Sequence, residues 1–397
     1  MNIRDNLKRL FLLLSMFIAS GRKNRPFWAL IFITRRCNQN CKICYVYDNR
    51  DGFMDLEDFR EIVDHLKKLG VKVISLFGGN ITLHLNLCEM VDYIHERGLF
   101  SYLSIDLTSC SLAKIEEIFR RHPHVISFSC DHVNSTYGDK KGLNLLEDKI
   151  SFIRKKSPCT LLQCNIALLK GNIGNVPLII SQLHKLCDGK IGFTVFPTSF
   201  PFETGRDLSL AKQLQICQND KGQILELIGW LRQRRKDGWI IMNPDSYLNH
   251  LPEHLCGEGS WNCAANKSIL TVDTTGEIIQ CSYQPSEIFR KQIIRPEVES
   301  GWLGGYSRAT CKSFEKMWAR KPEKSYQLYE FSFFHITDLT PHFYKQLRRP
   351  TRENQKDSNC LKNCFSQAYA CTSGYESSFR ERLRLLKHIL SIYFTRE

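Results

Sequence analysis

The sequence lacks a hydrophobic run long enough to cross a bilayer. Its most apolar stretch, LFLLLSMFIA at residues 10–19, has ten residues, whereas a transmembrane helix needs ~20. Acidic side chains are also few, because 41 Asp and Glu face 55 Lys and Arg and leave a formal net charge of +14. This charge favours an anionic ligand, peptide, protein partner or lipid headgroup, and does not choose among them.

Internal repeats, low-complexity tracts and recognised nucleic-acid modules are missing as well, so no nucleic-acid partner is expected. The 397 residues are 43% hydrophobic, which predicts a folded chain with a sizeable core. The 17 cysteines cluster towards the two ends of the sequence. In so large a chain, clustered thiols favour metal ligation over a disulfide scaffold.

Both ends of the chain predict basic amphipathic helices, at residues 1–26 and 376–397. The first leaves three interpretations open: a helix lying in a membrane surface, a helix packed on the protein itself, or a secretion signal ending near Ala19-Ser20-Gly21. The second leaves two, docking on the core or contact with a membrane. Peripheral membrane contact is therefore one of the expectations to test.

Residues 27–242 alternate between short apolar runs and amphipathic stretches. Strands are expected at 27–36, 71–79, 99–107, 124–131, 159–169 and 190–199, and helices at 55–70, 86–98, 111–123, 143–156, 176–187 and 222–238. This alternation predicts a parallel sheet, either doubly wound or closed into a complete or partial barrel. Beyond residue 243 the sequence is rich in turn formers, and the alternation is expected to stop.

The segment CNQNCKIC places Cys37, Cys41 and Cys44 directly after the first strand. Ligands bind at this end of parallel strands. A structural zinc site needs four closed ligands, yet the next cysteine, Cys88, is distant and no histidine is near. Three thiolates with an open position suit a [4Fe–4S] cluster that leaves one iron free.

Together with LFGGN at residues 76–80 and FSCD at 128–131, this cysteine motif resembles the radical S-adenosylmethionine (radical SAM) superfamily over residues 27–200. The resemblance implies an α/β fold with a partial (β/α)6 TIM-like barrel at 27–242. It also implies a [4Fe–4S] cluster on the three cysteines, whose open iron binds S-adenosylmethionine. An electron from a donor such as flavodoxin or ferredoxin then yields a 5′-deoxyadenosyl radical that abstracts hydrogen from substrate.

The resemblance further assigns Gly78, Gly79 and Asn80 to the S-adenosylmethionine site. The superfamily usually has glutamate at the third position, and its carboxylate accepts from the methionine ammonium. Asparagine can still accept a hydrogen bond but lacks the charge that strengthens it. Because of Asn80, an inactive relative of the superfamily is the alternative to an active enzyme.

Ser129 and Asp131 match the Ser-x-Asp that ends the fourth strand in peptide-modifying members. The resemblance places them near the ribose or carboxylate of S-adenosylmethionine. Lys141 falls where those members often have arginine, and would pair with the methionine carboxylate. The alternative for Asp131 is a loop cap.

A second set of cysteines lies in residues 243–375, and the resemblance extends to it. Cys263 and Cys281 bracket a predicted hairpin around DTTGE and resemble the opening of a SPASM or twitch extension. With Cys360, Cys364 and Cys371, this smaller cysteine-rich α+β extension is expected to bind one auxiliary [4Fe–4S] cluster. A closed zinc site is the alternative.

The expected function is a radical SAM enzyme that modifies a peptide. Only 26 residues precede the barrel, which are too few for the winged peptide-recognition domain of many such enzymes. Two alternatives stay open: a radical enzyme acting on a lipid-linked or other anionic small molecule at a membrane surface, and a non-catalytic iron–sulfur or zinc-binding interaction protein. Oxygen-sensitive clusters imply the reducing cytoplasm, with a peripheral position at the inner face of the membrane if the terminal helices bind lipid.

Overall fold

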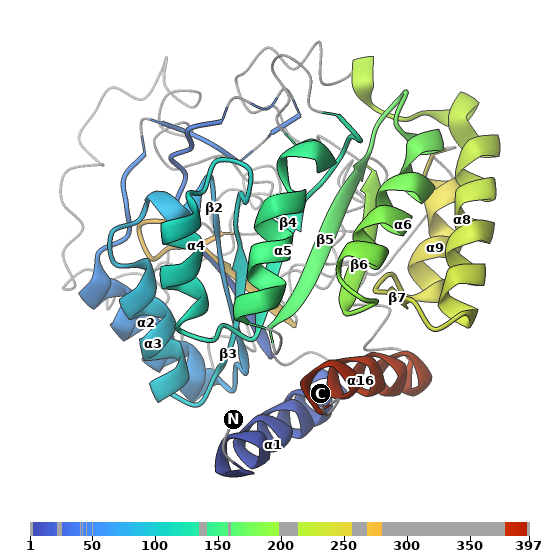
Figure 1. Cartoon of the computed structure of the whole chain (residues 1–397). Coiled ribbons are helices and arrows are strands. Elements are labelled where there is room, and N and C mark those ends of the chain that lie inside the picture. Colours follow the sequence, from blue (N-terminus) through green and yellow to red (C-terminus); the bar gives the residue numbers. More distant parts are fainter. Residues whose placement is uncertain are drawn as a thin grey trace, which may run out of the picture.

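A parallel β-sheet with helices on its outer face forms the body of the protein (Figure 1). The structure is a computed structural model. It describes residues 3–21, 26–39, 41, 43–44, 46–49, 51–134, 141–157, 160–197, 213–255, 268–279 and 378–394.

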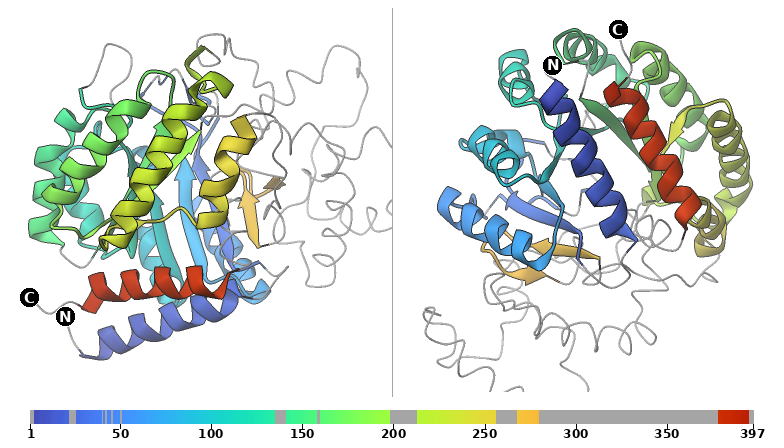
Figure 2. Two further views of the ribbon diagram at one scale, coloured as in Figure 1. Left: turned by 90° about the vertical axis from the view of Figure 1, so that its right-hand side faces the viewer. Right: turned by 90° about the horizontal axis from the view of Figure 1, so that it is seen from below.

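Within the described residues the sheet has nine strands in the order β7-β6-β5-β4-β3-β2-β1-β8-β9. The strands are β1 (Trp28–Thr34), β2 (Val73–Gly78), β3 (Phe100–Ser104), β4 (Val125–Ser129), β5 (Leu161–Leu168), β6 (Ile191–Pro197), β7 (Ile240–Ile241), β8 (Ile269–Val272) and β9 (Ile278–Ile279). All pairs are parallel except β8 with β9. The sheet curves into an incomplete barrel with helices around its outside (Figure 2), which confirms the expected partial barrel.

Helices follow the strands, as the alternation predicted. They are α2 (Leu56–Leu69), α3 (Leu87–Glu96), α4 (Leu112–Phe119), α5 (Glu147–Lys156), α6 (Val176–Leu186), α8 (Lys221–Lys236) and α9 (Asp245–Leu255), with short 3₁₀ turns at Ile81–Leu83, Leu143–Leu145, Ile173–Asn175 and Gln218–Asp220. In α2 the Asp55 side chain accepts from a first-turn N–H, and Gly70 ends the helix at φ 99°. Phe59, Ile62 and Leu66 form its buried face.

A helix that the sequence did not predict, α9, lies at the start of the turn-rich stretch near residue 243. There α9 packs beside α8 and buries Tyr247, Leu248 and Leu251. These residues share one helix face at spacings of three and four. Turn-forming residues surround this short apolar pattern, so the sequence did not predict a helix here.

The hairpin expected around DTTGE is confirmed, but its place in the sheet was not foreseen. Strands β8 and β9 pair antiparallel, and Gly276 adopts φ 81° in the turn between them. Strand β8 also pairs in parallel with β1, from Trp28 opposite Ile269. The hairpin therefore extends the barrel sheet next to the strand that leads into the cysteine loop.

Helices α1 (Ile3–Ser20) and α16 (Phe379–Phe394) lie side by side across the bottom of the barrel, at the ends where the strands begin (Figures 1 and 2). Leu13 and Leu386 pack there against apolar residues that begin the strands, such as Val73 and Phe100. Of the interpretations left open for the two ends, packing on the protein's own body is what the structure shows for these inner faces. Among the described residues, no helix has the length and apolar character needed to cross a membrane.

Candidate functional site

The three cysteines of the loop after β1 border one cavity. Cys37, Cys41 and Cys44 are each half-buried, and all line a cavity of about 420 Å³ inside the barrel. The backbone N–H of Gln39 donates to Cys37 Sγ at 3.3 Å, and that of Val46 to Cys44 Sγ at 3.4 Å. Such donors favour the thiolate, which is the form that ligates a metal.

Burial opposes this effect at one of the thiols. Desolvation raises the pKa of Cys37, the Gln39 N–H lowers it, and the nearby Cys44 and Asp106 raise it further. A positively charged metal centre would reverse the balance by replacing the proton. The loop is therefore suited to hold thiolates once a metal centre is bound.

Among the described residues, no three His, Cys, Asp or Glu side chains lie close enough to hold a single metal ion. A [4Fe–4S] cluster binds each thiolate to a different iron, so its ligands stand farther apart than those of one ion. The number and chemistry of Cys37, Cys41 and Cys44, and their shared cavity, fit such a cluster.

Gly78 ends β2 and Gly79 follows it, where the strand meets the start of the cysteine loop. A Cβ on Gly78 would lie 1.9 Å from Thr34 O, and one on Gly79 would lie 2.3 Å from Arg36 O. The Gly79 N–H donates to Thr34 O at 3.0 Å. Only glycine allows this approach, which fixes the loop against the end of β2.

Asn80 is 1% exposed and is not among the residues that line the cavity. Its Oδ1 accepts from Thr82 N at 3.1 Å and Thr82 Oγ1 at 2.7 Å. Its Nδ2 donates to Asn38 Oδ1 at 2.8 Å and Ser109 Oγ at 3.0 Å. The amide thus caps a short helix and ties the cysteine loop to the loop after β3.

The other three residues assigned by resemblance lie at the same end of the barrel. Ser129 and Lys141 line the cavity, whereas Asp131 does not. Asp131 is fully buried; its Oδ1 accepts from Ala167 N at 2.7 Å, and its Oδ2 lies 3.6 Å from Lys141 Nζ. Asp131 therefore braces a loop and holds Lys141, while Ser129 and Lys141 present polar atoms to the cavity.

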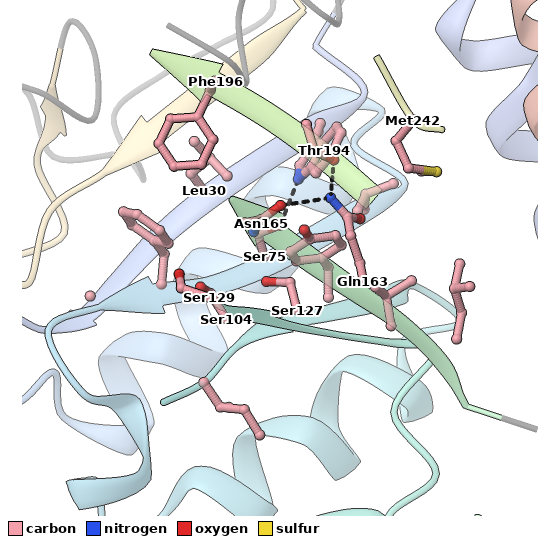
Figure 3. A pocket seen from close by; sticks show the side chains of 18 of the residues that line it. Leu30, Ser75, Ser104, Ser127, Ser129, Gln163, Asn165, Thr194, Phe196 and Met242 are labelled. Atoms are coloured by element: carbon pink, nitrogen blue, oxygen red, sulfur yellow. Dashed lines mark hydrogen bonds between the residues drawn. The ribbon is translucent and has the colours of Figure 1, made fainter. Parts of the chain in front are cut away.

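Neutral polar side chains from the strands cross the middle of the cavity (Figure 3). Gln163 Nε2 donates to Asn165 Oδ1 at 3.0 Å and to Thr194 Oγ1 at 2.9 Å. Burial raises the pKa of Tyr102 to about 12, so this phenol stays neutral. We call this set the polar belt; its members are Ser75, Tyr102, Ser104, Ser127, Ser129, Gln163, Asn165 and Thr194.

Of the polar belt, only Ser129 was expected from the sequence; its other members and Asp106 were not. A usable signal existed, since Gln163 and Asn165 alternate with buried apolar residues along β5. Polar residues at every second position of an otherwise apolar strand indicate a polar barrel interior. Asp106 carried no such signal, because it lies in a loop whose course the sequence does not reveal.

The cysteines expected to bind an auxiliary cluster lie outside the described residues. They are Cys263, Cys281, Cys360, Cys364 and Cys371.

Comparisons with known proteins agree with this arrangement. Residues 31–155 match the Radical SAM superfamily. The antilisterial bacteriocin subtilosin biosynthesis protein AlbA of Bacillus subtilis is 29% identical over 147 residues, which cover 32% of each chain. The PqqA peptide cyclase of Methylorubrum extorquens is 26% identical over 264 residues, which cover 64% of this chain and 66% of the cyclase.

Two solved structures show the same fold. SuiB of Streptococcus suis bound to S-adenosylmethionine has a TM-score of 0.53 at 14% identity, covering 86% of this chain and 72% of SuiB. Native anSMEcpe with bound AdoMet has a TM-score of 0.53 at 14% identity, covering 94% of this chain and 100% of that one.

The matched stretch spans 32% of the length of AlbA and 66% of that of the cyclase. The Radical SAM superfamily uses a [4Fe–4S] cluster and S-adenosylmethionine. Its match begins within β1 and contains the cysteine loop, the glycine pair and β2 to β4. Residues 31–155 therefore form a Radical SAM domain.

Proposed function

We propose that this protein is a radical SAM enzyme that modifies a peptide. The observation that carries the proposal is the placement of three half-buried thiols on a cavity whose interior presents neutral hydroxyl and amide groups. A bound cluster and S-adenosylmethionine supply a 5′-deoxyadenosyl radical when a donor such as flavodoxin or ferredoxin provides an electron.

The chain's own residues bind and orient. The three loop cysteines would hold the cluster, and Gly78 and Gly79 let the end of β2 approach the start of the cysteine loop. Ser129 offers a hydroxyl to the ribose or carboxylate of S-adenosylmethionine, and Lys141 offers a cation to that carboxylate. Apolar residues of α1 and α16, such as Leu13, Phe17 and Leu386, line the cavity where the strands begin. They keep water from that end of the cavity.

The neutral interior favours a peptide over an anionic substrate. Among the described residues that line the cavity, only Asp106, Lys141 and Arg382 are charged. The polar belt offers donors and acceptors that match a peptide group. The names of the two relatives, a peptide cyclase and a bacteriocin biosynthesis protein, point the same way.

Anaerobic reconstitution tests the enzymatic part. The wild-type protein should bind iron and sulfide and, under strong reduction, form 5′-deoxyadenosine. Replacing Cys37, Cys41 and Cys44 by alanine should abolish this product, whereas Cys217→Ala, at an exposed thiol, should not. A wild-type protein that loads iron but never cleaves S-adenosylmethionine would overturn the proposal.

Co-expression tests the peptide. The chain would be produced with each short peptide encoded beside its gene, and the peptide's mass and fragmentation compared with those from the triple cysteine variant. A mass change that needs the three cysteines is expected. If the enzyme forms 5′-deoxyadenosine but every peptide keeps its mass, the proposed peptide substrate is overturned and the proposed radical chemistry stands.

We also propose that residues 243–375 form an auxiliary-cluster extension, with ligands among Cys263, Cys281, Cys360, Cys364 and Cys371. The resemblance to SPASM and twitch sequences supports it. The double variant Cys263→Ala/Cys281→Ala should lose part of the bound iron and keep the rest on the loop cysteines. Zinc lost in place of iron would contradict the cluster.

A second proposal concerns the outer faces of the terminal helices. Phe11, Leu14 and Ile18 of α1 are 75%, 42% and 57% exposed, and Phe379 of α16 is 61% exposed. Phe11, Leu14 and Ile18 share one face of α1, and Phe379 lies on the adjacent helix with its ring 5.6 Å from that of Phe17; we call the four exposed residues the apolar ridge. Residues 10–21 contain no charged side chain.

We propose that this ridge contacts an anionic membrane surface. The exposed Arg380 and Lys387 of α16 and the net charge of +14 suit acidic headgroups, and the ridge suits the acyl boundary. Wild-type protein should co-sediment with phosphatidylglycerol vesicles and less with phosphatidylcholine. Phe11→Ser/Ile18→Ser should reduce this, while Leu225→Ser, at an exposed site on α8, should not. If wild type, Phe11→Ser/Ile18→Ser and Leu225→Ser are recovered equally in the supernatant, the membrane contact is rejected.

A further inference from the structure

The amide of Asn80 has no atom left for a ligand. Each of its two polar atoms makes two hydrogen bonds inside the protein, to Thr82, Asn38 and Ser109. The side chain is buried and lies off the cavity. Residue 80 is therefore not placed to receive the ammonium of S-adenosylmethionine, and another acceptor is needed if that cofactor binds.

A carboxylate lies close to this position, on the loop after the neighbouring strand. Asp106 follows β3 and lines the cavity together with Cys37 and Gln39. Its Oδ2 accepts from Ser109 Oγ at 2.5 Å, and the same Ser109 Oγ accepts from Asn80 Nδ2 at 3.0 Å. One hydroxyl thus separates the amide at position 80 from a carboxylate that borders the cavity.

The hydrogen bonds of Asp106 show which side of it can receive a ligand. A carboxylate offers about four lone-pair sites. Three are filled from its own loop, by Thr108 N at 3.0 Å, Thr108 Oγ1 at 2.6 Å and Ser109 Oγ. The fourth is filled by Gln39 Nε2 at 3.0 Å, which belongs to the cysteine loop. All four donors are neutral, so none offsets the negative charge of Asp106.

The Gln39 amide marks a donor site between the cysteine loop and Asp106. The amide and an ammonium both donate to an ionised carboxylate, but only the ammonium adds the attraction of opposite charges. The long side chain of Gln39 has the rotatable bonds to move aside. The exchange therefore favours a cationic ligand over the resident amide.

We propose that Asp106 is the carboxylate that binds the ammonium group of S-adenosylmethionine in this protein, and that Gln39 yields its place to that group. This inference rests on the proposed function. The Gly-Gly-Asn motif keeps the backbone geometry of its loop. The negative charge that glutamate usually supplies at position 80 comes instead from Asp106, after β3. Asn80 becomes a positioning residue that holds Asn38 and Ser109 in register.

Binding measurements on anaerobically reconstituted, iron-loaded protein test this assignment without catalysis. S-adenosylmethionine affinity would be measured by equilibrium dialysis for wild type, Asp106→Asn and the exposed control Asp58→Asn. Loss of a hydrogen bond to a charged group is worth ~1.5–3 kcal/mol, so Asp106→Asn should weaken binding roughly 10- to 100-fold. The control should bind as wild type.

A ligand without the amino group separates recognition from a loop defect. Wild type and Asp106→Asn should bind the desamino analogue of S-adenosylmethionine with similar affinity, because the interacting group is gone. An equal loss for both ligands, or no loss for either, overturns the role of Asp106. A wild-type protein that binds iron but neither ligand rejects the proposed function itself, so the two failures are distinct.

Discussion

The guanidinium of Arg35 lies against the carboxylate of Asp273, with Nε 2.9 Å from Oδ1 and both side chains at most 1% exposed. Arg35 stands two residues before Cys37, and 238 positions separate it from Asp273 in the β8–β9 turn. The guanidinium also stacks on Phe32, 4.1 Å from the ring centroid. This pair fastens the root of the cysteine loop to the hairpin that extends the sheet.

Asp273→Ala should destabilise the protein strongly, because it removes the carboxylate 2.9 Å from the buried Arg35 guanidinium and leaves that of Asp51 at 3.8 Å. Removing one partner of a buried pair costs ~3–5 kcal/mol, whereas replacing both by apolar residues is often neutral. Urea unfolding of the full chain would measure both effects. Arg35→Met/Asp273→Leu should unfold at a higher urea concentration than Asp273→Ala; the reverse order would contradict the pairing.

Gly79→Ala should displace the cysteine loop. The new Cβ would lie 2.3 Å from Arg36 O and 2.6 Å from Arg35 O, both backbone atoms that cannot rotate away. We expect a loss of ~1–3 kcal/mol or more from overpacking and less iron bound after reconstitution. The matched control is Gly229→Ala in α8, where nothing lies within 4 Å, and it should stabilise the helix by ~0.5–1 kcal/mol. Equal iron content in both variants would argue against this role of Gly79.

Leu13→Ala and Leu14→Ala should differ although they are neighbours. Leu13 is 2% exposed against the strands at the barrel bottom, and losing a buried leucine side chain costs ~2–5 kcal/mol. Leu14 belongs to the outer ridge, so its loss should change stability by less than ~0.5 kcal/mol. Thermal unfolding of the two variants measures this. Similar melting temperatures would mean that α1 does not pack as described.

Stability should fall in mild acid partly because of His254. Burial lowers the pKa of this side chain to about 4, below the ~6.5 of an unfolded histidine. Between these values the unfolded chain binds a proton that the folded chain refuses, so the free energy of unfolding decreases as pH drops from about 6.5 to about 4. His254→Gln should flatten this decline in urea titrations at several pH values. An unchanged slope would exclude His254 as a contributor.

Much of the barrel was predictable because its signals are local. The six strands and the helices between them follow from apolar periodicity, and Asp55 and Gly70 marked the ends of α2 before any contact was known. The cysteine spacing likewise indicated a three-thiol site, because ligand number depends on sequence neighbours. The short α9 was missed because only burial of one face, beside α8, makes its residues a helix.

Other features depended on which distant segments meet. Amphipathicity alone could not say whether α1 and α16 cover the barrel or contact a membrane, since both would bury an apolar face. In the structure, the inner face of each helix packs against the residues that begin the strands, and the apolar ridge lies on the outside.

The sequence by itself determined the alternation of strands and helices, the three thiols after the first strand and the glycine pair that follows. Only the tertiary structure decided what stands around those thiols. It committed Asn80 to Asn38 and Ser109, brought Asp106 to the cavity and set Asp273 against Arg35. The physical reason is that local propensity acts over a few residues, whereas these contacts arise where the strand order brings distant loops to one end of the sheet.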